Sequence, residues 1–210
     1  MAPLPAINPK HVFINCPFDK KYKPLLDASV FAIHDLGFQA RHALIDDAAA
    51  VRLTRIAREV ASSKYSIHDL SRVEIGGLLK VPRFNMPFEA GIAYCMHEFA
   101  ARGRDHHLLL LDSKPYRYQA SLSDAAGLDP KTHAGDPKLI IENVREFLVR
   151  KSSQPSLHGA VHIWKRYLLF LSRLPIAARA QRITMAELRS LGYVNDLQAM
   201  MVRWISSNPP

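Results

Sequence analysis

The chain has 210 residues, of which 48% are apolar, and it carries a formal net charge of +9. That length suits one α/β domain with a smaller appendage, and the apolar content is enough for a substantial core. No apolar run approaches the length of a membrane span, and the first residues lack the basic start and apolar core of a secretory signal. Two cysteines, Cys16 and Cys95, are too few for a disulfide scaffold or a zinc site. We therefore expect a cytoplasmic protein with no membrane partner, in which both cysteines are buried free thiols.

Short apolar runs alternate with segments of helical periodicity over the first 150 residues. Strands are predicted over residues 11–16, 38–43, 64–70 and 106–111. Helices are predicted over residues 23–36, 48–62, 87–102, 118–126 and 136–151. This alternation predicts βαβ units. It therefore predicts an α/β fold of the flavodoxin-like (Rossmann-like) three-layer class, built on a parallel sheet.

A polar stretch over residues 151–156 indicates a boundary between an α/β domain, residues 1–151, and a helical extension, residues 155–210. In the extension we expect a helix over 158–172, a short helix opened by a capping box at Thr184–Glu187, and a last helix over 196–206. The extension carries seven Lys and Arg against two Asp and Glu. This basic bias has two interpretations: a solvated helical face, or a surface that contacts a nucleic acid or another protein.

Polar side chains gather where the predicted strands end. In a parallel sheet these ends form one edge, and ligands bind outside it. The candidate ligand-binding residues after the first and third strands and in the loop before the next helix are Asn15, Asp19, His68, Asp69, Ser71, Arg72, Arg83 and Asn85. Several have a structural alternative, because Asp69 could cap a turn and His68 could be a core histidine. Arg72 and Arg83 would suit a phosphate or carboxylate if they point inward.

Glu89 lies in the first turn of the helix that begins near Asn85 and Pro87. Its neighbours in the sequence are mostly apolar, and Gly91, which has no side chain, would leave room for a ligand to approach. A carboxylate in such a setting is either a reactive acid or a simple partner of the helix dipole. We take the first interpretation, because the other strand-end residues converge on the same edge.

Three stretches together resemble the nucleoside 2-deoxyribosyltransferase-like proteins: Val12–Phe18, Ser66–Ser71 and Pro87–Ala93. The resemblance covers about residues 11–150. In that family the third strand ends in a ligand-binding aspartate, matched here by Asp69, and a glutamate, matched by Glu89, attacks the anomeric carbon. The chain is also similar to a bacterial group close to the TIR domains, which use a glutamate to cleave NAD. Some of these relatives act in defence against phage.

The resemblance implies an N-glycosidase that acts on a nucleoside, a nucleoside monophosphate or NAD, with NAD as a substrate and no separate cofactor. Glu89 would stabilise the oxocarbenium-like state or form a covalent intermediate, and Asp69 would help the base to leave. Asn15, Ser71 and Asn85 would hold sugar hydroxyls. The main-chain N–H groups around Cys16 to Asp19, in the loop that contains Pro17 and Phe18, would hold a 5′-phosphate. The resemblance also implies a homo-oligomer, since sites in the family often borrow residues from a neighbouring subunit.

Two other classes of function remain open. The fold could bind or sense a nucleotide without turning it over, while the basic residues 155–210 contact a protein or a nucleic acid. The chain could also be a purely structural subunit of an assembly. Hydrolysis and base transfer are equally compatible with the residues.

Overall fold

In the computed structural model the chain forms two compact units, Met1–Pro17 with Gln39–Ala134, and Phe18–Phe38 with Gly135–Pro210. The structure describes residues 4–43, 52–72, 75–76, 81–82, 84–99, 105–120, 122, 127–152 and 158–210. The units do not divide the chain at the predicted linker, because the first helix groups with the C-terminal helices.

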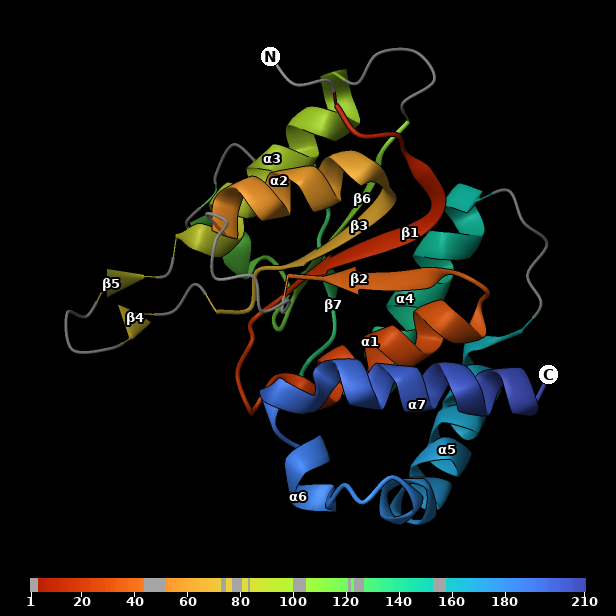
Figure 1. Ribbon diagram of the computed structural model, residues 1–210. Helices are drawn as coiled ribbons and strands as arrows, with labels where there is room; N and C mark the ends of the chain where they lie inside the picture. The colour runs from red at the N-terminus through yellow and green to blue at the C-terminus, as the bar shows by residue number, and fades with distance from the viewer. Residues whose placement is uncertain are drawn as a thin grey trace. The chain divides into compact units, whose positions relative to one another are not determined.

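The first unit is built on a five-stranded sheet in which every neighbouring pair is parallel. Its strand order is β2-β1-β3-β6-β7 (Figure 1), the flavodoxin-like order. The strands are β1 (Asn8–Asn15), β2 (Gln39–His42), β3 (Ser63–Asp69), β6 (His107–Asp112) and β7 (Lys131–Thr132). The predicted α/β fold class is thereby confirmed.

The order of the strands reverses at β1, which lies between β2 and β3. In sheets of this kind the reversal leaves a crevice at the carboxyl ends of the two strands that flank it. Here those strands are β1 and β3, and in their register Asn15 lies opposite His68. The last residues of the two most central strands therefore meet where this fold class binds ligands.

Two helices, α2 (Arg52–Ser62) and α3 (Asn85–Phe99), contact each other and also contact β1 and β3 (Figure 1). One stripe of α3 is buried, and its residues are spaced as one helical face: Met86, Glu89, Ala90 and Ala93. Met86 and Ala90 pack against Leu110 of β6. At the other end of α3, His97 Nδ1 is 2.6 Å from the carbonyl of His106, which precedes β6. The amino end of α3 therefore lies over the carboxyl end of the sheet.

The long loop predicted over residues 71–84 contains a short antiparallel pair, β4 (Ile75–Gly76) and β5 (Val81–Pro82). A 3₁₀ helix, η1 (Arg117–Ala120), occupies part of the predicted helix 118–126, the rest of which lies largely outside the described residues. Strands β4, β5 and β7 have two residues each, too short to show an alternating pattern. The expectation for Cys95 was wrong, because Cys95 is exposed on α3 whereas Cys16 is buried.

The second unit consists of helices. Its first helix, α1 (Lys23–Asp35), contacts α4 (Pro137–Ser152), α5 (Ala160–Ala180) and α7 (Val194–Ser207). A short α6 (Met185–Leu188) opens with the predicted capping box, and η3 (Leu191–Tyr193) leads into α7. Helix α5 continues eight residues beyond its predicted end at residue 172. It passes through Pro175, which removes one backbone N–H from the helix without ending it.

A buried ion pair joins α1 to α5. Arg166 Nε is 2.9 Å from Asp35 Oδ1, and Arg166 Nη2 donates to the Asn208 carbonyl at 2.7 Å. The guanidinium also lies 5.2 Å from the ring centroid of Trp204, which packs on Phe31. Burial raises the pKa of Asp35, and Arg166 opposes that rise. The pair therefore fixes the orientation of α5 on α1.

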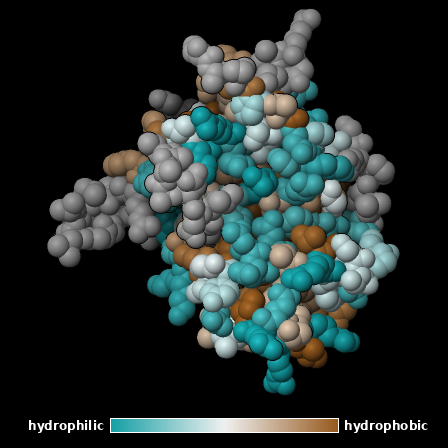
Figure 2. All heavy atoms as spheres, in the orientation of Figure 1, coloured by the Kyte–Doolittle hydropathy of each residue, from teal (hydrophilic) through white to brown (hydrophobic). Residues whose placement is uncertain are grey.

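No helix in the described ranges is long and apolar enough to cross a membrane. On the face drawn in Figure 2, hydrophilic residues cover much of the described surface, and the brown apolar patches are small and separated.

We expect Arg166→Met to lower the free energy of unfolding by about 3–5 kcal/mol, since it leaves the Asp35 carboxylate buried without its cation. The double variant Asp35→Asn/Arg166→Met should recover part of that loss. Urea unfolding measures both. Arg150→Met is the matched control, because the exposed Arg150–Glu146 pair contributes at most about 1 kcal/mol. Equal losses for Arg166→Met and Arg150→Met would contradict the role assigned to the buried pair.

Candidate functional site

Asn15 and His68 form a buried polar pair at the strand reversal. Both side chains are fully buried, and Asn15 Nδ2 is 3.2 Å from His68 Nδ1. The amide nitrogen can only donate, so the neutral imidazole accepts at Nδ1 and carries its proton at Nε2. Phe13, two residues earlier on β1, packs against the His68 ring in a T-shaped arrangement at a centroid distance of 6.1 Å. The pair is therefore held by packing as well as by its hydrogen bond.

Burial lowers the pKa of His68 to about 3, and the nearby His106 adds to this shift. His68 is therefore neutral near pH 7 and does not serve as a general acid there. Its Nε2–H is a fixed hydrogen-bond donor instead. The lowered pKa argues against acid catalysis by His68 near pH 7, and its role in substrate binding stays a prediction.

Two atoms of this pair lack a hydrogen-bond partner among the described residues: His68 Nε2 and Asn15 Oδ1. A buried polar atom without a partner costs about 1–3 kcal/mol, so proteins seldom keep one without a use. One of these atoms donates and the other accepts. A hydroxyl group both donates and accepts, so a sugar hydroxyl would match the two atoms together.

Glu89 faces the same side of the sheet as His68. In the register of β3 and β6, His68 lies opposite Leu110, so both side chains point to one face. Leu110 packs against Met86 and Ala90, which belong to the same buried stripe of α3 as Glu89. Only 4% of Glu89 is exposed, and its Oε2 has no hydrogen-bond partner in the described part of the chain. A carboxylate is thus buried beside the carboxyl edge of the sheet with one oxygen uncommitted.

Asp69 follows His68 in β3. Because strand side chains alternate, its side chain leaves the strand on the opposite face of the sheet. Its Oδ1 accepts hydrogen bonds from the backbone N–H of Ser71 at 2.8 Å and from the Ser71 hydroxyl, and its Oδ2 is 3.0 Å from Nε2 of His133. The structural alternative for Asp69, a cap on the turn after β3, is therefore realised. His133, which follows β7, was not predicted, because a two-residue strand carries no signal in the sequence.

A second acidic residue ends the neighbouring strand. Asp112, at the end of β6, is paired with Arg117, which also donates to the Leu70 carbonyl at 3.1 Å. Sequence reasoning missed both residues. The signal was present for Asp112, because it follows the run Leu108–Leu111 as Asp69 follows its own strand.

The other predicted residues differ in their burial and in their position in the fold. Pro17 is buried, Arg72 is half-buried, and Asn85 is exposed as the first residue of α3, while Arg83 lies outside the described residues. Gly91 is exposed, and a Cβ added there would meet nothing within 4 Å. It lies off the buried stripe that carries Glu89, so it does not open the approach to that carboxylate as expected.

Phe18 and Asp19 belong to the second unit. The Asp19 carboxylate accepts the backbone N–H groups of Lys21 and Tyr22, each at 2.9 Å, and so forms the turn before α1. The proposed phosphate contact of this loop stays a prediction.

Comparison with protein-family models, with curated proteins and with solved structures found no match to this chain. Within the described residues, no group of three or more His, Cys, Asp or Glu side chains is placed to hold a metal ion. The side chains at the carboxyl edge of the sheet are therefore the basis for assigning a function.

We expect the stability of the protein to decline as the pH falls below about 6.5, with His68 as one cause. The folded pKa of His68, about 3, lies below its unfolded value, so the unfolded state binds the extra proton between these limits. One such histidine contributes a slope of up to about 1.4 kcal/mol per pH unit. His68→Gln should reduce the fall in unfolding free energy between pH 7.5 and pH 5, measured in urea. His162→Gln, at an exposed position, is the comparison variant, and an unchanged slope in His68→Gln would contradict the assignment.

We also expect Glu89→Gln to raise the free energy of unfolding at pH 7 by about 1–2 kcal/mol, because it removes a buried charge that lacks a full set of partners. Glu98→Gln, at an exposed position of the same helix, should change it by less than about 0.5 kcal/mol. Thermal and urea unfolding of the three proteins provide the measurement. A loss of stability in Glu89→Gln would mean that the carboxylate is structural.

Proposed function

We propose that this chain binds a nucleoside or nucleotide at the carboxyl edge of the sheet and cleaves its N-glycosidic bond, with Glu89 as the reacting carboxylate. The observation that carries the proposal is the uncommitted, buried Glu89 carboxylate, on the same face as the open donor and acceptor of His68 and Asn15. These groups lie beside the strand reversal, where this fold class binds nucleotides.

The chemistry requires a carboxylate of this kind. Breaking the bond between the anomeric carbon and the base leaves the electron pair on the base nitrogen and positive charge on the sugar. An ionised Glu89 would stabilise that charge or bond to the carbon, and a low-dielectric surrounding strengthens the effect. Water would then complete a hydrolysis, and a second base would complete a transfer.

The departing base needs a proton. We assign that proton to the Asp69–His133 pair, which would have to reach the base over the carboxyl edge from the face opposite Glu89, and within the pair to His133 rather than to Asp69 as first predicted. Asp69 accepts from Ser71 at one oxygen and approaches His133 with the other, which suits it to orient an imidazole. Asp69 then acts as a positioning residue.

Both oxygens of Asp69 already have partners within the protein, and this also favours a second candidate function. If Asp69 and His133 serve only to fix the turn after β3, the edge would hold a nucleotide without a proton donor for the base. The protein would then be a nucleotide-binding or sensing module. It would bind its ligand tightly and release no base.

The test is to incubate the purified protein separately with NAD, deoxynucleosides and nucleoside monophosphates, and to follow free base by chromatography. We expect base release from at least one of these substrates, and a fall of about 10²–10³-fold in Glu89→Gln, the range for losing one electrostatic group in a transition state. Glu98→Gln should retain full activity. His133→Gln should lower the rate most for the substrate whose base is the poorest leaving group.

Equilibrium dialysis with the same compounds separates the outcomes. Base release equal in wild type and Glu89→Gln would remove the enzymatic proposal. Tight binding without turnover would support the binding module. If the protein showed neither binding nor turnover, both functions would be rejected.

A further inference from the structure

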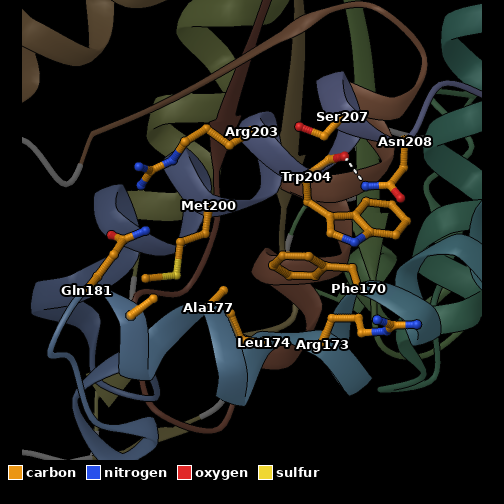
Figure 3. A pocket seen from close by; sticks show the side chains of 11 residues that line it. Phe170, Arg173, Leu174, Ala177, Gln181, Met200, Arg203, Trp204, Ser207 and Asn208 are labelled. Atoms are coloured by element: carbon orange, nitrogen blue, oxygen red, sulfur yellow. Dashed lines mark hydrogen bonds between the residues drawn. The ribbon is translucent and has the colours of Figure 1, made fainter.

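An apolar groove runs between α5 and α7 in the second unit (Figure 3). Its floor is formed by Phe170, Leu174 and Ala177 of α5 and by Met200 and Trp204 of α7, and its volume is about 340 Å³. A second hollow of about 400 Å³ shares Ala177 and Trp204 with the first and extends it along α5 to Leu169 and Ile176. Leu169 is 49% exposed and Ile176 is 70% exposed. The two hollows thus form one continuous groove with large apolar side chains open to solvent.

Two guanidinium groups stand at the margins of this groove, Arg173 on α5 and Arg203 on α7. In Figure 3 both side chains extend away from the apolar floor. Arg203 Nε donates to the carbonyl of Ala199 in its own helix, at 3.4 Å. Among the residues that line the two hollows there is no Asp or Glu. Each side of the groove therefore offers a positive charge, and the described residues that line the groove include no carboxylate.

We propose that this groove binds an amphipathic helix of another protein, with an apolar stripe for the floor and acidic residues on both flanks. Charge complementarity carries the choice of occupant, because Arg173 and Arg203 project from opposite walls. A carboxylate at each flank of a central apolar stripe would meet both. From Leu169 to Ala180 the groove spans about 17 Å of α5 at 1.5 Å per residue, which corresponds to about three turns of a bound helix.

Other occupants fit these features less well. A second copy of this chain, docked symmetrically through the same groove, would bring arginines toward arginines. A nucleic acid would match the positive charge but not the exposed Leu169 and Ile176, since interfaces with nucleic acids are polar. The sequence left a nucleic acid or another protein as the partner of the basic residues 155–210. The exposed apolar side chains of the groove favour the protein.

The test uses the full chain and three fluorescein-labelled, stapled 14-residue peptides in anisotropy titrations. One peptide carries leucines at i, i+3, i+4, i+7 and i+11 with glutamates on both flanks. The second has lysine in place of every glutamate, and the third has the composition of the first in a scrambled order without a stripe. We expect the acidic amphipathic peptide to bind at least tenfold more tightly than either of the others.

Charge reversal tests the site itself. Arg173→Glu/Arg203→Glu should weaken the acidic peptide at least tenfold and should reverse the preference toward the lysine peptide. The matched control Lys165→Glu/Arg179→Glu makes the same change in net charge at residues that do not line the groove, and it should keep the original preference. Circular dichroism confirms that each variant is folded, and Trp204 fluorescence in Trp164→Phe reports occupancy of the floor.

Three results would overturn the proposal. One is a loss of discrimination, seen as equal binding of all peptides or as an equal effect of the two double variants. The second is a 20-base-pair DNA duplex that binds more tightly than the acidic peptide and loses affinity in Arg173→Glu/Arg203→Glu. The third is self-association of the wild type, measured by sedimentation, that Ile176→Asp abolishes.

Discussion

The candidate site depends on the parallel register of β1 against β3. That register places Asn15 and His68 side by side as the last residues of the two innermost strands, with their side chains on the face that α3 covers. A shift of one residue in either strand would send one of the two side chains to the opposite face and break their hydrogen bond. The buried aliphatic and aromatic residues of both strands fix the register, so the core of the sheet determines the geometry of the polar pair.

The sequence was sufficient for the class of fold and for much of the edge. Strong apolar runs bounded by Pro17 and by polar turns located β1, β3 and β6, and their alternation with helices predicted the parallel sheet. The approximate position of Glu89 on its helix followed from Pro87. The sequence did not show which way each side chain points. Asp69 and Glu89 were expected at the same edge of the sheet, and strand alternation points Asp69 to the face opposite His68, whereas Glu89 faces His68.

Other features were missed for lack of a local signal. His133 reaches Asp69 from a strand of two residues, and a pairing that distant in sequence leaves no pattern near residue 133. The position of Gly91 was misjudged because the sequence contains more apolar residues in α3 than one stripe needs. Arg166 had appeared only as part of a basic excess, yet it forms a buried pair with Asp35. Burial, which decides whether a charge is solvated or structural, emerges only from packing.

The brevity of β7 has a consequence for the motions of this edge. Only two residues of β7 pair with β6, so few hydrogen bonds resist its separation from the sheet, whereas β1 and β3 pair along most of their length. Local opening should therefore be much more frequent at the outer strand than at the centre. His133, which follows β7 directly, would move with that strand, while Asn15 and His68 would stay in place. We therefore expect the side of the edge that carries His133 to open often, and the side that carries Asn15 and His68 to stay closed.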